Sequence, residues 1–119
     1  MNVVLWIVEV LLALLFAVHG RVMLFPEKEQ TQWMPYIEAI PSALRRFIGA
    51  VEVLAAVGLI LPQLTNILPW LTPLAGAGLV IVMVLAIIFH IPRKEYPNII
   101  FNLVLLILSA FVVYGRFVI

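Results

Sequence analysis

The chain has 119 residues, of which 66% are hydrophobic and 11% are charged, and its formal net charge is +1. A soluble domain has roughly 45–50% apolar and about 25% charged residues, so this composition excludes an ordinary water-soluble protein. The near-neutral charge indicates no nucleic-acid partner, and the absence of cysteine excludes disulfides, thiol–disulfide chemistry and iron–sulfur ligation by this chain.

Four apolar runs follow one another along the chain and predict four transmembrane helices. The first run begins Met1-Asn2-Val3 without Lys or Arg, so we expect a retained helix and not a signal peptide. Lipid offers the backbone no hydrogen bonds, which favours helices over open strands. The sequence therefore predicts an all-α membrane protein, a single four-transmembrane-helix bundle over residues 1–119. The runs are near the roughly 20 residues needed to cross a bilayer, at about 3–25, 44–61, 73–90 and 98–114.

Prolines and aromatic residues mark the connections between these runs. Proline removes a backbone donor and clashes with the preceding helical turn, so it favours helix ends. The prolines are Pro26, Pro35 and Pro41, then Pro62, Pro69 and Pro73, then Pro92 and Pro97. Tyr and Trp favour the headgroup level of a bilayer. We therefore expect interface anchors at Trp33, Tyr36, Trp70 and Tyr96.

Basic residues gather on one side of the predicted bundle and indicate its orientation. The opposite side has Arg116 and the N-terminal amine. The positive-inside tendency predicts that loops 26–43 and 91–97 are cytoplasmic and that both termini are outside. The basic residues on the cytoplasmic side are Arg21, Lys28, Arg45, Arg46, Arg93 and Lys94.

Polar side chains inside the runs predict a ligand-binding site in the cytoplasmic half of the bundle. Glu52 is the strongest candidate, because a carboxylate near mid-membrane must be protonated, paired or hydrated. A rise of about 1.5 Å per residue brings His19, His90, Asn102 and Arg45 to neighbouring depths. Each has a structural alternative: Glu52 and the histidines as paired groups, Asn102 as interhelical glue, and Arg45 as a headgroup contact.

Glu9 stands apart, closer to the outer side, and is the candidate for a second polar site that reaches water. Two histidines without an H-x-x-x-H or E-x-x-H spacing give no reason to expect a metal. No motif of a soluble enzyme is present, so the sequence names no catalytic residue and leaves open whether the chain is an enzyme.

Several landmarks occur in a fixed order along the chain: FAVHGRVM at 16–23, RFIGAVEV at 46–53, GLVIVM at 78–83 followed by Ala86 and His90, and a closing Gly115-Arg116. Through these landmarks the chain resembles the DoxX-like family of small four-helix membrane proteins, which are mostly bacterial. The resemblance implies a bacterial cytoplasmic (inner) membrane location. It also implies association with redox systems, because namesake proteins are linked to a thiosulfate–quinone oxidoreductase and to oxidant-defence complexes. Arg21 stands where the family usually has Lys.

Three functions are compatible with these observations. The first is a ligand-binding or accessory subunit of a membrane redox system, with a quinone-like or other amphiphile in a lipid-open cavity that ends at Glu52. The second is a non-enzymatic membrane chaperone or assembly factor, a role found in the wider superfamily, with packed polar groups and an exposed small-residue face such as that of Gly58. The third is a small proton-coupled transporter formed as a homo-oligomer. Expected partners are the lipid bilayer and membrane or redox proteins.

Overall fold

A computed structural model describes residues 2–27 and 34–118 of the chain. Within these residues four helices are long and apolar enough to cross a membrane, which confirms the predicted all-α, four-transmembrane-helix bundle. The chain is a multi-pass membrane protein in a lipid environment. Trp33 and Lys28 lie outside the described residues. The helices are α1 (Asn2–Leu24), the short α3 (Tyr36–Ala39), α4 (Ser42–Thr65), α5 (Leu71–His90) and α6 (Tyr96–Val118).

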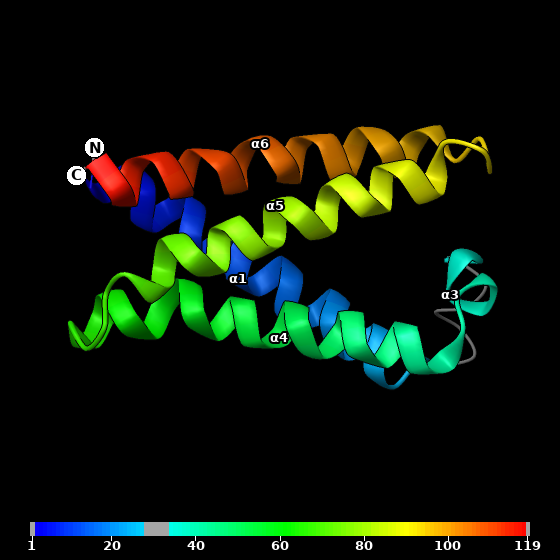
Figure 1. Cartoon of the computed structure of the whole chain (residues 1–119), viewed down its shortest axis with the longest axis horizontal. Helices are drawn as coiled ribbons and strands as arrows, with labels where there is room; N and C mark the ends of the chain where they lie inside the picture. Colours follow the sequence, from blue (N-terminus) through cyan, green and yellow to red (C-terminus); the bar gives the residue numbers. More distant parts are fainter. Residues whose placement is uncertain (1, 28–33, 119) are drawn as a thin grey trace.

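The long helices pack side by side in the order α1, α4, α5, α6, and α6 closes the bundle against α1. Figure 1 shows α3 and the α5–α6 connection at one end of the bundle, and both termini with the α4–α5 connection at the other. We call these the α3 end and the terminal end. The α3 end holds most of the basic residues of the connections and helix ends, namely Arg21, Arg45, Arg46, Arg93 and Lys94.

An apolar core fills the middle of the bundle, while many large hydrophobic side chains point outward. Lipid is as apolar as these side chains, so outward exposure costs little, and the helices associate through close packing and internal polar contacts. Leu12 and Phe16 of α1 lie in the core, between Glu9 and His19 along the same helix. The other core members are Ala55, Ala56, Leu59, Leu79, Met83, Leu105 and Val112.

Two glycines bring the backbones of α1 and α4 into contact. A Cβ atom added to Gly49 would lie 2.7 Å from the Gly20 carbonyl oxygen, and one added to Gly20 would lie 2.8 Å from the Gly49 carbonyl oxygen. Small residues permit such crossings in membranes. The crossing holds His19, the neighbour of Gly20, close to Glu52 of the facing helix.

Pro62 lies inside α4, which continues to Thr65, so the prediction that Pro62 belongs to the second connection is wrong. Proline has no N–H to donate to the carbonyl four residues earlier, which here is Gly58. The Thr72 hydroxyl of α5 donates to that carbonyl over 3.0 Å. A neighbouring helix thus supplies the hydrogen bond that the proline removes, as membrane helices require.

Gly49→Ala should separate α1 from α4 and lower the free energy of unfolding by about 1–3 kcal/mol, the usual cost of overpacking. Gly78→Ala is the matched control, because an added Cβ meets no atom within 4 Å there. The measurement is thermal unfolding of each purified variant in one detergent. Equal stability of the two variants would contradict a backbone crossing at Gly49.

Thr72→Val should destabilise the bundle by about 1 kcal/mol, because the half-buried Gly58 carbonyl then has no donor. Pro62→Ala restores a backbone N–H at position 62, so Thr72→Val should cost much less in the Pro62→Ala background. A double-mutant cycle of unfolding free energies measures this coupling. Additive effects would show that Thr72 does not replace the missing donor.

Candidate functional site

His19 connects a buried carboxylate to a tyrosine hydroxyl at the α3 end of the bundle. Its Nδ1 lies 2.7 Å from Glu52 Oε2, and its Nε2 lies 2.9 Å from the Tyr36 hydroxyl oxygen. When Glu52 is ionised and the ring is neutral, Nδ1 donates to Glu52 and Nε2 accepts from Tyr36. The Glu52 side chain is 1% exposed and that of His19 is 29% exposed. His19 therefore links the buried Glu52 carboxylate by a hydrogen bond to the surface of the protein.

Tyr36 faces inward at the start of α3. It packs with Ile37, Val22 and Met23 in a small apolar cluster, and its ring meets the His90 ring edge-on at 5.0 Å between centroids. The prediction that Tyr36 is an interface anchor is therefore wrong. Burial, and after it the negative charges of Glu52 and Glu95, raise the pKa of Tyr36 to about 12, so this hydroxyl stays protonated and able to donate.

The connection between α5 and α6 holds a second cluster beside Tyr36. His90 Nδ1 lies 2.8 Å from Glu95 Oε1, and Arg93 Nε donates to the same oxygen over 2.7 Å. Partial burial opposes ionisation of Glu95, but the hydrogen bonds and positive charges of His90 and Arg93 outweigh it and hold the pKa of Glu95 below its ordinary value. This cluster lies at the α3 end of the bundle. It is the part of the polar group farthest from Glu52.

The remaining sequence-predicted residues, Asn102 and Arg45, are not hydrogen-bonded to this group. Asn102 is buried in α6 and its Nδ2 has no partner among the described residues, and the same holds for Nε of Arg45. The structure thus joins His19 to Glu52 directly and His90 to them through Tyr36. Among residues 2–27 and 34–118, no three His, Asp or Glu side chains lie together as a potential metal site.

Glu9 forms a second polar cluster, at the terminal end. It is fully buried and does not reach water by snorkelling. Arg116 of α6 donates to both of its carboxylate oxygens, from Nε to Oε1 and from Nη2 to Oε2, the latter over 3.2 Å. Arg116 Nη1 also donates to Asn2 Oδ1 over 2.8 Å, and the guanidinium carbon lies 5.5 Å from the Trp6 ring centroid.

Sequence reasoning missed Tyr36 and Arg116. Tyr36 was assigned to the headgroup level because it lies in a connection, although the apolar pair Tyr36-Ile37 between Pro35 and Pro41 was a signal for a short helix that folds back. Arg116 entered the sequence analysis as a basic residue on the side opposite the cytoplasmic one, and its pairing with Glu9, 107 residues earlier in the chain, was not predicted.

Comparison with known proteins confirms the family resemblance that the landmarks in the sequence indicated. A model of the DoxX-like family matches residues 7–112, a range that includes Glu9, His19, Tyr36, Glu52 and His90 but ends before Arg116. No curated protein and no solved structure matches the chain.

Glu95→Gln should lower thermal stability at neutral pH and lose this effect in acid. The pKa of Glu95 is lower in the folded protein than its ordinary value of 4.5, so its contribution is complete above 4.5 and disappears as the pH falls through the lowered pKa. The measurement is the difference in unfolding temperature between the original protein and the variant from pH 7 to pH 3. Glu38→Gln, at an exposed position of α3, is the control. A difference that does not change with pH would contradict the assignment.

Proposed function

The chain belongs to the DoxX-like family, and we propose that it is a ligand-binding accessory protein of a membrane redox system. In this proposal Glu52, His19 and Tyr36 exchange a proton with a bound quinone-like amphiphile. The observation that carries the proposal is the bridging position of His19, whose two ring nitrogens meet Glu52 and Tyr36 while part of its side chain is accessible.

The proton chemistry follows from the order of the groups. The Tyr36 hydroxyl passes its proton to His19 Nε2 and takes one from the ligand, which makes an imidazolium that Glu52 stabilises at 2.7 Å. The Nδ1 proton then moves to Glu52, which stores it as a neutral carboxylic acid, and Nε2–H now donates to the Tyr36 oxygen. The raised pKa of Tyr36 keeps its hydroxyl protonated before and after the transfer. Histidine is suited to this exchange because its charge changes near neutral pH.

Two unused donors support a ligand with acceptor oxygens. Asn102 Nδ2 and Arg45 Nε are buried without a partner among the described residues, and buried donors normally find one. The carbonyl oxygen of an amphiphile is an acceptor of the required kind, and its apolar tail would lie in lipid. The cavity at the terminal end and the groove between α5 and α6 are lined by neither Glu52 nor His19. A ligand would therefore reach this group through the accessible part of His19.

The charge distribution supports the location that we propose, a bacterial cytoplasmic membrane with the α3 end in the cytoplasm and both termini outside. Arg45 and Arg46 at the start of α4 and Arg93 and Lys94 in the α5–α6 connection share the α3 end. Such a bias in short loops sets orientation in multi-pass proteins.

A membrane assembly factor is the second candidate. The pairing of Glu52 Oε2 with His19 favours it, because such a protein needs packed polar groups and no ligand. Its expected docking face at Gly58 is not free, however, since a Cβ added to Gly58 would lie 3.0 Å from Ala75 of α5. A proton path across the membrane is less well supported, because the core residues Leu12 and Phe16 separate the two polar clusters along α1.

The test is mass spectrometry of small molecules that copurify with the protein in native lipid. The original protein should retain a quinone-like amphiphile, and Glu52→Gln should retain it at least about tenfold less, since hydrogen bonds to charged groups contribute about 1.5–3 kcal/mol. Glu52→Gln keeps the shape of the side chain and removes its charge.

Glu9→Gln is the matched control, because Glu9 is also a buried, paired glutamate but lies at the opposite end of the bundle. It should retain the amphiphile. Identical small molecules in all three preparations, with each protein still folded, would reject the ligand-binding proposal and favour an assembly factor. Collapse of Glu52→Gln alone would show that Glu52 is structural.

A further inference from the structure

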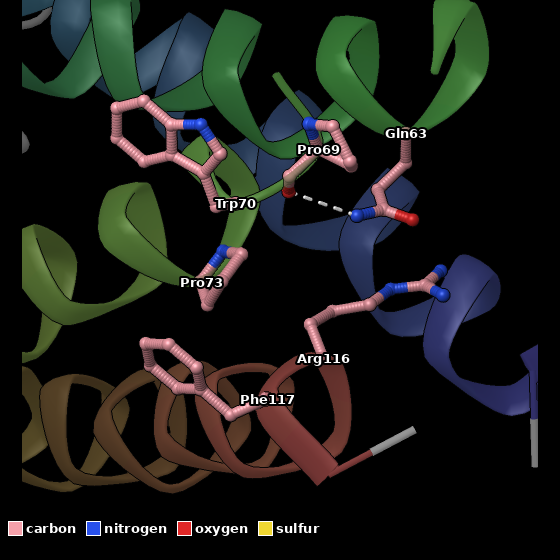
Figure 2. Close-up of a pocket in the computed structure, with 6 residues that line it drawn as sticks. All are labelled: Gln63, Pro69, Trp70, Pro73, Arg116 and Phe117. Carbon is pink, nitrogen blue, oxygen red and sulfur yellow. Dashed lines mark hydrogen bonds between the residues drawn. The ribbon is translucent and has the colours of Figure 1, made fainter. Parts of the chain in front are cut away.

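A cavity with two polar side chains in its lining, Gln63 and Arg116, opens at the terminal end, far from Glu52 along the bundle. It has a volume of about 330 Å³ and is lined by residues of α4, the α4–α5 connection, α5 and α6. Figure 2 shows Gln63 and Arg116 on opposite sides of it, with Pro73 and Phe117 along another wall. Ligand cavities have volumes of roughly 300–1,000 Å³, so this space fits a headgroup. The full lining is Gln63, Pro69, Trp70, Pro73, Arg116 and Phe117.

An apolar groove between α5 and α6 adjoins this cavity, since Phe117 lines both. The groove has a volume of about 580 Å³. It runs from Phe117 toward mid-membrane past Ala77 and Ala110, whose small side chains leave room between the helices. A cavity with polar side chains at the membrane surface beside an apolar groove is the form expected for one amphiphile, with its head in the cavity and a chain along the groove on the lipid-facing side. The other groove residues are Val80, Ile81, Val113, Tyr114 and Val118.

The charges around the cavity favour a neutral head. Arg116 is the cation in its lining, and Glu9 neutralises it through two hydrogen bonds. Because the pair carries no net charge, it gives an anionic or a cationic head little attraction to offset the loss of that head's hydration. A neutral head does not bear this cost.

The hydrogen-bonding groups select the chemistry of that head. A guanidinium has five N–H donors, and the bonds to Glu9 and Asn2 use three of them, which leaves donors for a carbonyl oxygen. Gln63 donates from Nε2 to the Pro69 carbonyl over 3.0 Å, which leaves its amide oxygen to accept from a hydroxyl. The site therefore matches a head with one carbonyl and one hydroxyl group.

We infer that the terminal end of this protein binds a neutral acylglycerol lipid. Its ester carbonyl accepts from Arg116, its hydroxyl donates to Gln63, and an acyl chain lies in the α5–α6 groove. The inference goes beyond the proposed function, because it uses neither Glu52 nor His19 and its test gives the same result whether or not a redox ligand binds at the α3 end.

The test is photolabelling in phosphatidylcholine vesicles with a diacylglycerol that carries a diazirine in one acyl chain. Label mapped by peptide mass spectrometry should concentrate on α5 and α6 between residues 77 and 118. Unlabelled dioctanoylglycerol should compete, and dioctanoyl phosphatidic acid should not. Label spread evenly over all four long helices, or equal competition by the anionic lipid, would overturn the inference.

Two variants test the two halves of the site separately. Gln63→Leu should reduce labelling by about fivefold, the effect of one hydrogen bond of about 1 kcal/mol, and Ala110→Phe should block the groove and reduce it at least as much. Leu54→Phe, on a lipid-facing side of α4, is the control and should label normally. Unchanged labelling in both Gln63→Leu and Ala110→Phe would overturn the inference.

A further variant tests whether the neutral pair of Glu9 and Arg116 determines the preference for a neutral head. Glu9→Gln leaves Arg116 with an uncompensated positive charge, so phosphatidic acid should become the stronger competitor. An unchanged preference in folded Glu9→Gln would reject neutrality as the basis of selection. If this variant does not fold, Gln63→Leu and Ala110→Phe still decide the inference, because both leave the pair of Glu9 and Arg116 intact.

Discussion

Bilayer hydrocarbon offers a buried polar group no hydrogen bond, so such a group is stabilised only where the protein or a ligand supplies a partner. Glu52 meets this requirement through His19, Glu9 through Arg116, and the Gly58 carbonyl, left without a donor by Pro62, through Thr72. Each partner comes from a different helix. These contacts therefore help to fix α1 beside α4, α1 beside α6 and α4 beside α5, whereas lipid-facing apolar side chains, which lipid solvates equally well, favour no particular neighbour.

Close approach of the helices at glycines makes two of these pairs geometrically possible. Gly20 and Gly49 bring α1 onto α4 beside His19 and Glu52, and Gly115 brings α6 onto Leu5 of α1 beside Arg116. A larger side chain at these positions would increase the separation of the helices and lengthen hydrogen bonds that depend on a few tenths of an ångström. The glycines and the ionisable residues thus act together, and neither set explains the bundle by itself.

Hydropathy alone predicted the helices, because an apolar run near 20 residues has few alternatives in a membrane. The cost of a buried carboxylate likewise singled out Glu52. The sequence could not predict the inward turn of Tyr36, the pairing of Glu9 with Arg116, or the continuation of α4 through Pro62. Each depends on a partner distant in the chain, for example the hydroxyl of Thr72. The sequence also could not show that the nitrogens of Asn102 and Arg45 have no partner. Similar depth in the membrane suggested that these residues contact Glu52, but depth does not determine which side chains form hydrogen bonds.

The two buried glutamates differ in when their partners are made. His19 precedes Glu52 in the chain, so α1 and α4 can enter the bilayer as a hairpin in which the carboxylate is already hydrogen-bonded. Glu9 lies in α1, but Arg116 lies in α6, which is synthesised after α1, α4 and α5. Before α6 joins the bundle, Glu9 lacks the guanidinium that pairs with it in the folded protein, so its carboxyl group must be protonated or hydrated. The contact between α1 and α6 thus depends on the order in which the helices assemble as well as on how they pack.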